Sequence, residues 1–380
     1  MTEKLYYKDA YIRDFEASVL SYTECDGGYD LVLDRTAFFP EEGGQYSDGG
    51  VIGGFTVMHV YEKDGVVHHI TDGLPKGDTV VCSVDFEQRH IRMQCHTAEH
   101  ILCGIIHSLF GLDNVGFHLG DDEVTFDVNG LLDREQLDRV EELANKAVFA
   151  NIAVTTMFPT ADELSGIEYR SKLDITDGVR LVKIGDIDTC ACCAPHVSST
   201  GEIGLIKILD FTKHRGGTRI WMVAGMAALK DYRAKYDNIK RISAILSAPQ
   251  LQTADTLQAY VLECDQVKAA LKQARLSLAS LAADRVESTE GSGVYLLEDF
   301  SIPELIAFSN VAVEKIGDIL VAMCGSEGDY KYVISSRTRD MRAMAKEINS
   351  ALRGRGGGRP EMIQGSFSAS LEEIKNYFNK

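Results

Sequence analysis

Residues 85–111 read DFEQRHIRMQCHTAEHILCGIIHSLFG, and the rest of the sequence is interpreted outward from this stretch. Asp85 and Gln88, three residues apart, resemble a helix-capping box, and Gly111 is a residue type that commonly follows the end of a helix. Between these signals, residues 89–110 contain no proline and carry apolar side chains on every face. The pattern predicts a long and largely buried helix.

Two pairs of potential metal ligands stand out, the first inside this helix. His96 and His100 are four residues apart, so a helix places both imidazoles on one face, about 6 Å apart. Cys192 and His196 form a second pair four residues apart, in a turn that contains Pro195. One thiolate and three imidazoles are suitable ligands for tetrahedral zinc. The two pairs together predict one zinc ion per chain, bound by His96, His100, Cys192 and His196.

Other interpretations of these residues stay open. Cys193 can replace Cys192 as the thiolate ligand, although we favour Cys192. The cysteines and histidines can also be inert buried side chains, or the two pairs can bind two separate metal ions. The sequence of residues 96–100 also fits the HxxEH pattern of inverted zinc metalloproteases, in which Glu99 is the general base. Those enzymes use a carboxylate as third ligand, so the downstream Cys192 and His196 argue against a peptidase.

The remaining segments indicate an α+β fold class. Residues 4–85 alternate short β-prone runs with turn pairs such as Gly27-Gly28, which predicts a small antiparallel β-barrel. After residue 224, apolar residues recur with a strict three-four alternation typical of a helical hairpin or coiled-coil arm; a helix of a bundle is the alternative. The heptad positions are Leu257, Tyr260, Cys264, Val267, Leu271, Ala274, Leu278 and Leu281.

Four parts are therefore expected along the chain. They are a glycine-rich β-barrel subdomain (1–87), an α+β zinc-containing domain (88–225), a helical arm (226–290) and a small C-terminal α/β domain (291–380).

Composition and charge narrow the class of protein. The chain has 380 residues, of which 45% are hydrophobic and 25% charged, which excludes disordered and fibrous proteins. It has no apolar stretch of membrane-spanning length and no apolar signal core near Met1, so we expect a cytoplasmic protein with no membrane partner. The net charge is −18, but residues 1–206 carry 15 basic and 36 acidic side chains, whereas residues 207–380 carry 24 and 21. Any nucleic-acid contact is therefore expected mainly in the C-terminal part.

Several segments resemble the editing domain of alanyl-tRNA synthetases and its free-standing relatives, the alanyl-tRNA editing proteins of the AlaX type. Besides the HxxxH and CxxxH pairs, residues 36–45 (TAFFPEEGGQ) are similar to the family's TxFYPxGGGQ element, with Glu42 where a glycine is usual. Residues 180–185 (RLVKIG) and 201–208 (GEIGLIKI) also resemble family segments. Residues 350–367 resemble the glycine-rich element of the C-terminal DHH-associated domain. The family usually reads CGGTH where this chain has Cys193-Ala194-Pro195 between its two ligands.

The resemblance implies a function. It implies a zinc-containing deacylase that hydrolyses the ester of mischarged alanine tRNA, chiefly seryl-tRNA and also glycyl-tRNA. It also implies that the C-terminal domain binds tRNA and that the helical arm forms a homodimer. A tRNA-binding accessory protein with a structural zinc is a different class of function that the same residues allow.

Individual roles follow from the resemblance and from charge. Thr36 and Gln45 are expected to bind substrate near the reaction, with Thr36 bonding to the serine hydroxyl; a turn-capping role is the alternative for Thr36. Glu99, on the ligand helix, is the candidate for proton transfer, or else a carboxylate that supports a ligand. The basic residues expected to contact tRNA are Arg215, Arg219, Arg355 and Arg359.

Overall fold

The computed structural model describes residues 1–120, 124–171 and 178–379. By contact, the chain divides into two compact units, Met1–Ile239 and Lys240–Lys380, and each is described by itself.

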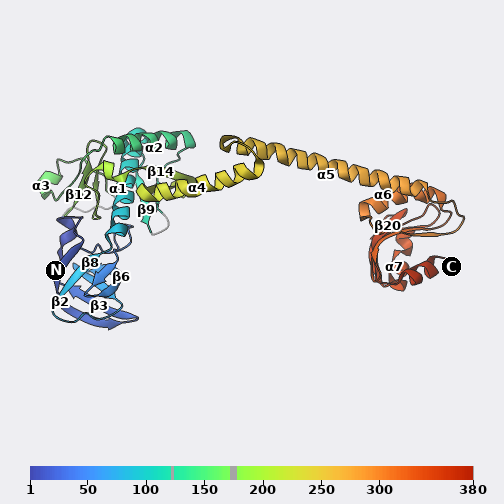
Figure 1. The fold of residues 1–380 in the computed structure, drawn as a ribbon, viewed down its shortest axis with the longest axis horizontal. Helices are drawn as coiled ribbons and strands as arrows, with labels where there is room; N and C mark the ends of the chain where they lie inside the picture. Colours follow the sequence, from blue (N-terminus) through green and yellow to red (C-terminus); the bar gives the residue numbers. More distant parts are fainter. Residues whose placement is uncertain (121–123, 172–177, 380) are drawn as a thin grey trace. The chain divides into compact units, whose positions relative to one another are not determined.

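A closed antiparallel ring of six strands opens the first unit (Figure 1). The hydrogen-bonding order is β2-β3-β7-β6-β5-β8, with β8 returning to β2, so the predicted barrel corresponds to this ring. Side chains alternate between its two faces: Leu31, Val60, Val67 and His69 are buried, as expected for strands with period two. Its strands are β2 (Asp14–Cys25), β3 (Gly28–Leu33), β5 (Gly50–Ile52), β6 (Phe55–Lys63), β7 (Val66–Thr71) and β8 (Thr79–Val84). A short parallel pair, β1 (Glu3–Lys4) with β4 (Arg35–Thr36), and the 3-10 turn η1 (Leu5–Tyr7) accompany it.

The predicted buried helix is α1 (Phe86–Phe110). Asp85 caps its first turn by accepting a hydrogen bond from the backbone N–H of Gln88, and Gly111 ends it in the left-handed conformation at φ 65°. The side chains from Met93 to Ile106 are buried without interruption, which explains why the apolar residues occur on every face.

Two small sheets and a second helix surround α1. The helix α2 (Arg134–Phe149) lies beside α1 (Figure 1). A four-stranded sheet has the order β14-β15-β10-β9, and a three-stranded sheet has the order β11-β12-β13. The bounds are β9 (Asn114–Leu119), β10 (Val124–Val128), β11 (Val154–Met157), α3 (Ala161–Leu164), β12 (Leu181–Ile184), β13 (Asp188–Ala191), η2 (Thr200–Ile203), β14 (Ile206–His214) and β15 (Gly217–Ala224).

A buried ion pair attaches α1 to the connecting segments between the preceding strands. The Arg89 guanidinium contacts the Asp48 carboxylate through Nε and Nη2, and both side chains have no exposed surface. Arg89 also donates to the carbonyls of Ala10 and Ala37, and Asp48 accepts the N–H of Phe39 at 2.5 Å. Because every charged group of the pair has partners, its burial is compensated.

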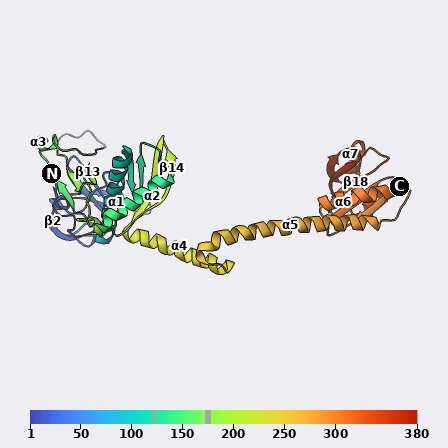
Figure 2. The same ribbon diagram turned by 90° about the horizontal axis from the view of Figure 1, so that it is seen from above.

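The second unit contains a five-stranded mixed sheet with the order β16-β17-β18-β20-β19. Its helix α6 packs against α5 and against β17 and β18 (Figure 2). The bounds are α4 (Gly225–Leu246, which begins in the first unit), η3 (Gln250–Gln252), α5 (Thr253–Asp284), β16 (Gly293–Leu296), α6 (Ile302–Ala312), η4 (Val313–Lys315), β17 (Leu320–Ser326), β18 (Asp329–Ser335), α7 (Met341–Ala351), β19 (Gly354–Gly358), β20 (Met362–Phe367) and α8 (Leu371–Phe378).

The fold class is α+β, as predicted. The expected helical segment is the 32-residue α5, whose heptad residues Leu271 and Leu278 are 59% and 57% exposed. Homodimerisation through this surface and the four-part domain division stay predictions. In the part of the chain that the structure describes, no helix combines the length and apolarity needed to cross a membrane.

Candidate metal centre

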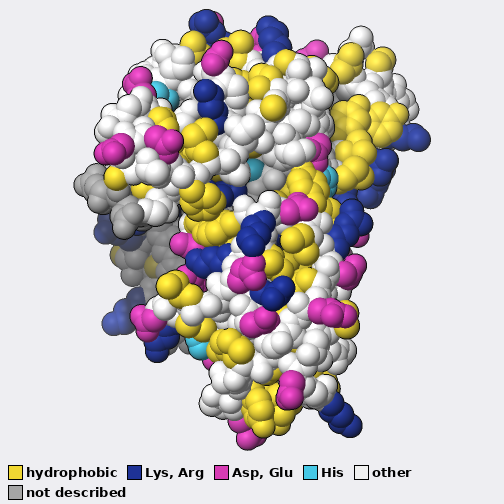
Figure 3. Space-filling view, turned by 90° about the vertical axis from the view of Figure 1, so that its left-hand side faces the viewer, with side chains coloured by type: hydrophobic (Ala, Val, Ile, Leu, Met, Phe, Trp, Pro, Cys, Tyr) yellow, Lys and Arg dark blue, Asp and Glu magenta, His cyan; other side chains and the backbone are white. Residues whose placement is uncertain are grey.

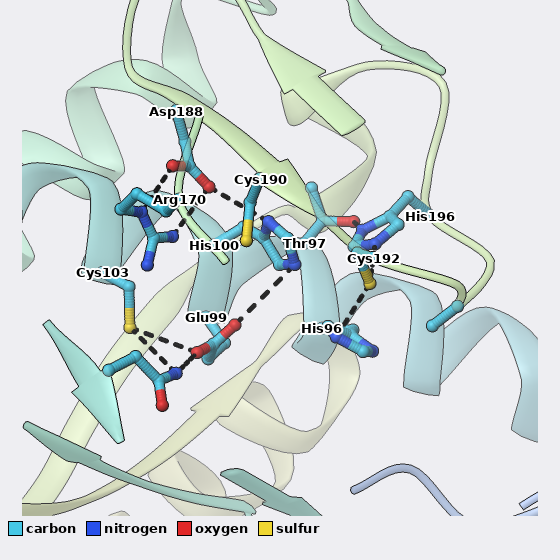
Figure 4. Close-up of polar contacts among 12 residues, drawn as sticks. His96, Thr97, Glu99, His100, Cys103, Arg170, Asp188, Cys190, Cys192 and His196 are labelled. Carbon is cyan, nitrogen blue, oxygen red and sulfur yellow. Dashed lines mark hydrogen bonds and ion pairs between the residues drawn. The ribbon is translucent and has the colours of Figure 1, made fainter. Parts of the chain in front are cut away.

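Four predicted ligands from two separate segments converge on one point (Figure 4). His96 and His100 lie one turn apart on α1, and Cys192 and His196 lie in the loop after β13. One donor atom from each side chain lies within 4.8 Å of the other three. The Cys192 Sγ is 3.3 Å from His196 Nε2 and 3.6 Å from His96 Nε2. Bonds of about 2.0 to 2.3 Å from one central zinc ion require donor atoms at about such separations.

Each of the three imidazoles is fixed from behind through its Nδ1 atom. Such a bond selects the tautomer with hydrogen on Nδ1 and leaves the Nε2 lone pair free for a metal. The partners are Gln45 Oε1 for His96 at 2.8 Å, Asp188 Oδ2 for His100 at 3.0 Å and Thr97 Oγ1 for His196 at 3.0 Å. Because Thr97 donates its own hydroxyl hydrogen to the Met93 carbonyl, its oxygen is available to accept from His196.

Arg180 shapes the loop that carries Cys192. Its Nη1 donates to the carbonyls of Cys192 and Ala194 at 2.8 and 2.9 Å, and its own carbonyl accepts the N–H of Cys192 at 3.0 Å. Burial alone would raise the pKa of the Cys192 thiol, but the neighbouring His96 and His196 hold that pKa well below its usual range. Cys192 therefore lies in an environment that favours the thiolate, the form that binds metals.

Asp188 supports the site from β13, which approaches α1 closely at a glycine. A Cβ atom on Gly104 would lie 2.5 Å from the Ile187 carbonyl oxygen, so no larger residue fits there without displacing β13. Asp188 receives two hydrogen bonds from Arg170, at 2.8 and 2.9 Å, besides the one from His100. Burial would raise the pKa of Asp188, but His100 and Arg170 keep it below the usual value. Asp188 is thus an ionised partner of His100.

Glu99 is buried beside His100. One of its oxygens accepts hydrogen bonds from the Asn114 amide and, at 3.1 Å, from the Cys103 thiol. The other oxygen is 4.0 Å from His100 Nε2. The structure therefore brings Glu99 next to a predicted ligand, with one oxygen facing that ligand's metal-binding nitrogen.

The glycine-rich element contributes a tight turn of four residues. Glu42 and Gln45 exchange both backbone hydrogen bonds, at 3.2 and 3.0 Å, and the two residues between them, Gly43 and Gly44, have φ of 64° and 85°. Positive φ at both central positions is typical of a type I′ turn and favours glycine. The turn directs the fully buried Gln45 side chain onto His96, while its Nε2 has no partner among the described residues.

Thr36 ends the short strand β4 outside the ligand cluster, and its side chain is bonded to His69 on β7 of the ring. Its hydroxyl oxygen is 2.9 Å from His69 Nε2 and accepts the N–H of Phe38 at 3.1 Å, while His69 Nδ1 faces the carbonyl of Leu31 at 3.2 Å. Burial lowers the pKa of His69 to about 4, so the ring is neutral at pH 7. With Nδ1–H directed at Leu31, the Thr36 hydroxyl donates to His69 and keeps one oxygen lone pair.

The predicted tRNA-contacting arginines lie outside the ligand cluster. Arg219 on β15 forms two hydrogen bonds with Asp127, at 2.7 and 2.8 Å, and Arg215 is exposed in the β14–β15 turn. Arg355 and Arg359 are exposed at β19 of the second unit. On the face shown in Figure 3, charges of both signs are interspersed.

The chemistry of the donor set fits zinc. One thiolate and three imidazoles match the ligand types of tetrahedral zinc sites. A second group, His100 with Asp188 and Cys190, also has metal-ligand composition. Its Asp188 carboxylate already receives three hydrogen bonds from Arg170 and His100, so this group supports the main site.

Sequence comparison finds relatives that match part of the chain and relatives that match nearly all of it. Residues 179–242 match the family model described as the threonyl and alanyl tRNA synthetase second additional domain. The chain is 30% identical to "Alanyl-tRNA editing protein AlaX-L" of Pyrococcus horikoshii, over 98% of this chain and 96% of that protein. The alanine–tRNA ligases of Halobacterium salinarum and Hyperthermus butylicus are 34% and 29% identical over 86% and 95% of the chain.

The relatives differ in how much of their own length this chain matches. The chain spans only 38% and 42% of the two ligases, but nearly all of the editing protein. It therefore belongs to the family of alanyl-tRNA editing proteins. A solved structure, the C-Ala domain of the Aquifex aeolicus alanyl-tRNA synthetase, aligns with 23% of this chain and 87% of that one, at 19% identity and a TM-score of 0.21.

Some supporting residues were not anticipated from the sequence. Arg170, Asp188 and Arg180 carry most of the hydrogen bonds behind the ligands, and Asn114 and Cys103 hold Glu99. Asp188 could have been found from the sequence, because it is an acidic residue only four positions before the predicted ligand Cys192. None existed for Arg170, which reaches the site only through the pairing of its backbone with Cys190.

The ligand assignment predicts the metal content of variants. Purified protein should contain about one zinc ion per chain, and His96→Ala or Cys192→Ala should lose most of it, because a shell lacking one donor binds much more weakly. Elemental analysis after dialysis measures this. His107→Ala is the matched control: this histidine is on the same helix but is exposed and bonded to Asp113. Full metal content in both ligand variants would refute the assignment.

Proposed function

We propose that this protein hydrolyses the aminoacyl ester of mischarged alanine tRNA, chiefly seryl-tRNA and also glycyl-tRNA, and that it does so in the cytoplasm. The observation that carries the proposal is the cluster of His96, His100, Cys192 and His196, with each imidazole oriented through its Nδ1. Full-length similarity to an editing protein supports the same function.

The residues around the cluster suggest how the ester is handled. A bound zinc ion supplies a Lewis acid that can polarise a carbonyl or lower the pKa of water. Gln45 Nε2, buried and without a described acceptor, is the donor that we assign to a substrate oxygen. Glu99, with one oxygen facing the site and the other fixed by Asn114, is the candidate for moving a proton.

The two alternative functions are less well supported. An inverted metalloprotease takes a carboxylate as its third ligand, whereas here Cys192 and His196 complete the cluster. A purely structural zinc would explain four protein ligands. It would not explain why the buried amide donor of Gln45, so close to a predicted ligand, has no partner among the residues that the structure describes.

A deacylation assay tests the proposed function. Incubating the protein with seryl-, glycyl- and alanyl-charged alanine tRNA should release serine fastest, glycine measurably and alanine slowest. A site that bonds to the extra hydroxyl of serine is left with an unpaired polar group when alanine enters. Removal of zinc by a chelator should abolish release. If none of the three esters is hydrolysed faster than in buffer, the accessory-protein interpretation replaces this one.

Thr36→Val tests the proposed role of Thr36 in choosing serine. Valine keeps the volume but removes the oxygen lone pair that can accept from the serine hydroxyl. We expect discrimination between seryl- and alanyl-tRNA to fall by about 1 to 3 kcal/mol, measured as the ratio of the two kcat/KM values. Valine also leaves His69 Nε2 without its donor, so the melting temperature should fall too. A lower melting temperature with an unchanged ratio would make Thr36 purely structural.

We assign tRNA binding chiefly to the exposed Arg355 and Arg359 beside β19, together with the exposed Arg215 and the partly buried Arg219. The double variant Arg355→Gln/Arg359→Gln should bind tRNA more weakly and reduce the slope of log affinity against log salt concentration by about 1 to 2, since two phosphate contacts are lost. Arg353→Gln is the matched control, because its guanidinium is paired with Glu373 at 2.6 Å. An unchanged slope would remove these two residues from the interface.

A further inference from the structure

His196 differs from the two predicted ligands on α1 because a loop carries it. His96 and His100 keep their spacing through the helix itself, whereas His196 lies between β13 and η2, outside any helix or strand. Its place therefore depends on the hydrogen bonds that the loop makes with other segments. At His196 these come from Thr97, whose hydroxyl oxygen lies 3.0 Å from His196 Nδ1 (Figure 4) and accepts the N–H of Val197 at 3.3 Å.

One carboxylate holds the backbone that follows His196. Glu202 Oε1 accepts hydrogen bonds from the N–H groups of Ser198 and Ser199, at 3.1 and 3.2 Å, and from the Ser198 hydroxyl at 2.6 Å. Its other oxygen accepts from the Tyr11 hydroxyl at 2.7 Å. Burial would raise the pKa of Glu202, but the hydrogen bonds from Ser198 and Tyr11 keep it below the usual value. Glu202 is therefore an ionised acceptor for all four donors.

Tyr11 reaches the same group from the start of the chain. Its hydroxyl oxygen accepts the Ser198 N–H at 2.8 Å while its hydrogen is donated to Glu202, so the phenol bonds to both the loop and the carboxylate. The segment that carries Tyr11 is itself anchored to α1, because the carbonyl of Ala10 accepts a hydrogen bond from the buried Arg89 at 3.1 Å.

Glu202 also contacts the helix that carries His96. Its backbone carbonyl accepts a hydrogen bond from the side-chain amide of Gln94 at 2.7 Å, and Gln94 is buried on α1, two residues before His96. The oxygen of the same amide lies against Gly225, where a Cβ atom would be only 2.5 Å away. Glu202 thus connects the ligand loop to the ligand helix through its carboxylate on one side and its carbonyl on the other.

We propose that Tyr11 and Glu202 are positioning residues for His196, which keep its imidazole in the ligand cluster by holding the backbone two residues further on. The inference rests on the proposed metal centre. Partners directly behind a metal-bound histidine commonly change metal affinity about 10- to 100-fold. Because Tyr11 and Glu202 act through the backbone, we expect smaller losses in zinc affinity on their removal, of about 3- to 10-fold.

The zinc affinity of full-length variants tests this role. Competition with a chromophoric chelator measures it without reference to enzymatic activity, and the melting temperature of the metal-free protein is measured alongside. Tyr11→Phe keeps the ring and removes the hydroxyl, and Glu202→Ala removes the carboxylate. Each should bind zinc about 3- to 10-fold more weakly than the wild type. Glu202→Gln keeps an oxygen that can accept from the loop N–H groups and should bind zinc more tightly than Glu202→Ala.

Tyr61→Phe is the matched control. Tyr61 on β6 also donates its hydroxyl hydrogen to a carboxylate, that of Asp30 at 2.7 Å, but within the strand ring. Its replacement should lower the melting temperature and leave zinc affinity unchanged. An equal loss of zinc affinity in Tyr61→Phe would overturn the proposal, because it would identify a general effect of destabilisation.

Two further outcomes would contradict the proposal, and they differ in what they exclude. Wild-type zinc affinity in either Tyr11→Phe or Glu202→Ala would overturn the positioning role and leave the metal centre standing. A wild-type protein that binds no zinc would overturn the metal centre and the positioning role together. If Glu202→Ala fails to fold, Tyr11→Phe decides, since it removes one hydroxyl from a partly buried ring.

Discussion

The buried pair of Arg89 and Asp48 sets the register on which the metal centre depends. Arg89 is on α1, seven residues before His96, and Asp48 is three residues after Gln45. Seven residues of helix rise about 10 Å, so fixing Arg89 against Asp48 also fixes where Gln45 meets the helix. Removing either charge would leave the other buried without compensation, which commonly costs about 3 to 5 kcal/mol. The segment that carries Gln45 and Asp48 is thus attached to the helix that carries His96 and His100.

The centre is assembled from segments that are distant in the sequence. The glycine-rich turn supplies Gln45, α1 supplies two ligands, and β13 with its following loop supplies the other two ligands and Asp188. Close approach between these segments is possible because small residues stand at the contacts, Gly104 on α1 and Gly43 in the turn. Backbone packing therefore brings the four predicted ligands together.

The convergence of the four predicted ligands could be predicted from the sequence because their chemistry is local. HxxxH in a helix and CxxxH in a loop each define a chelating pair, and a capped, proline-free segment defines α1. The strands of the barrel were predictable for the same reason, since alternation and turn residues act over a few positions. The partners of Thr36 and Glu99 were not, because His69 and Asn114 reach them only through tertiary packing. The roles of Arg215 and Arg359 stay predictions, since exposure alone does not identify a partner.

The three side chains that bond to the Nδ1 atoms of the histidines differ in chemistry. This difference makes the three histidines unequal as proposed metal ligands. Asp188 is a carboxylate, Gln45 an amide and Thr97 a hydroxyl. An imidazole whose N–H faces an anion carries more electron density on its opposite nitrogen and is the stronger base. Among the three histidines of the proposed metal centre, His100 is therefore expected to be the strongest donor, even though Arg170 shares the charge of Asp188, and His196 the weakest. In the proposed centre the ligands are thus unequal, and the loop-borne His196 is the one most easily exchanged for another ligand.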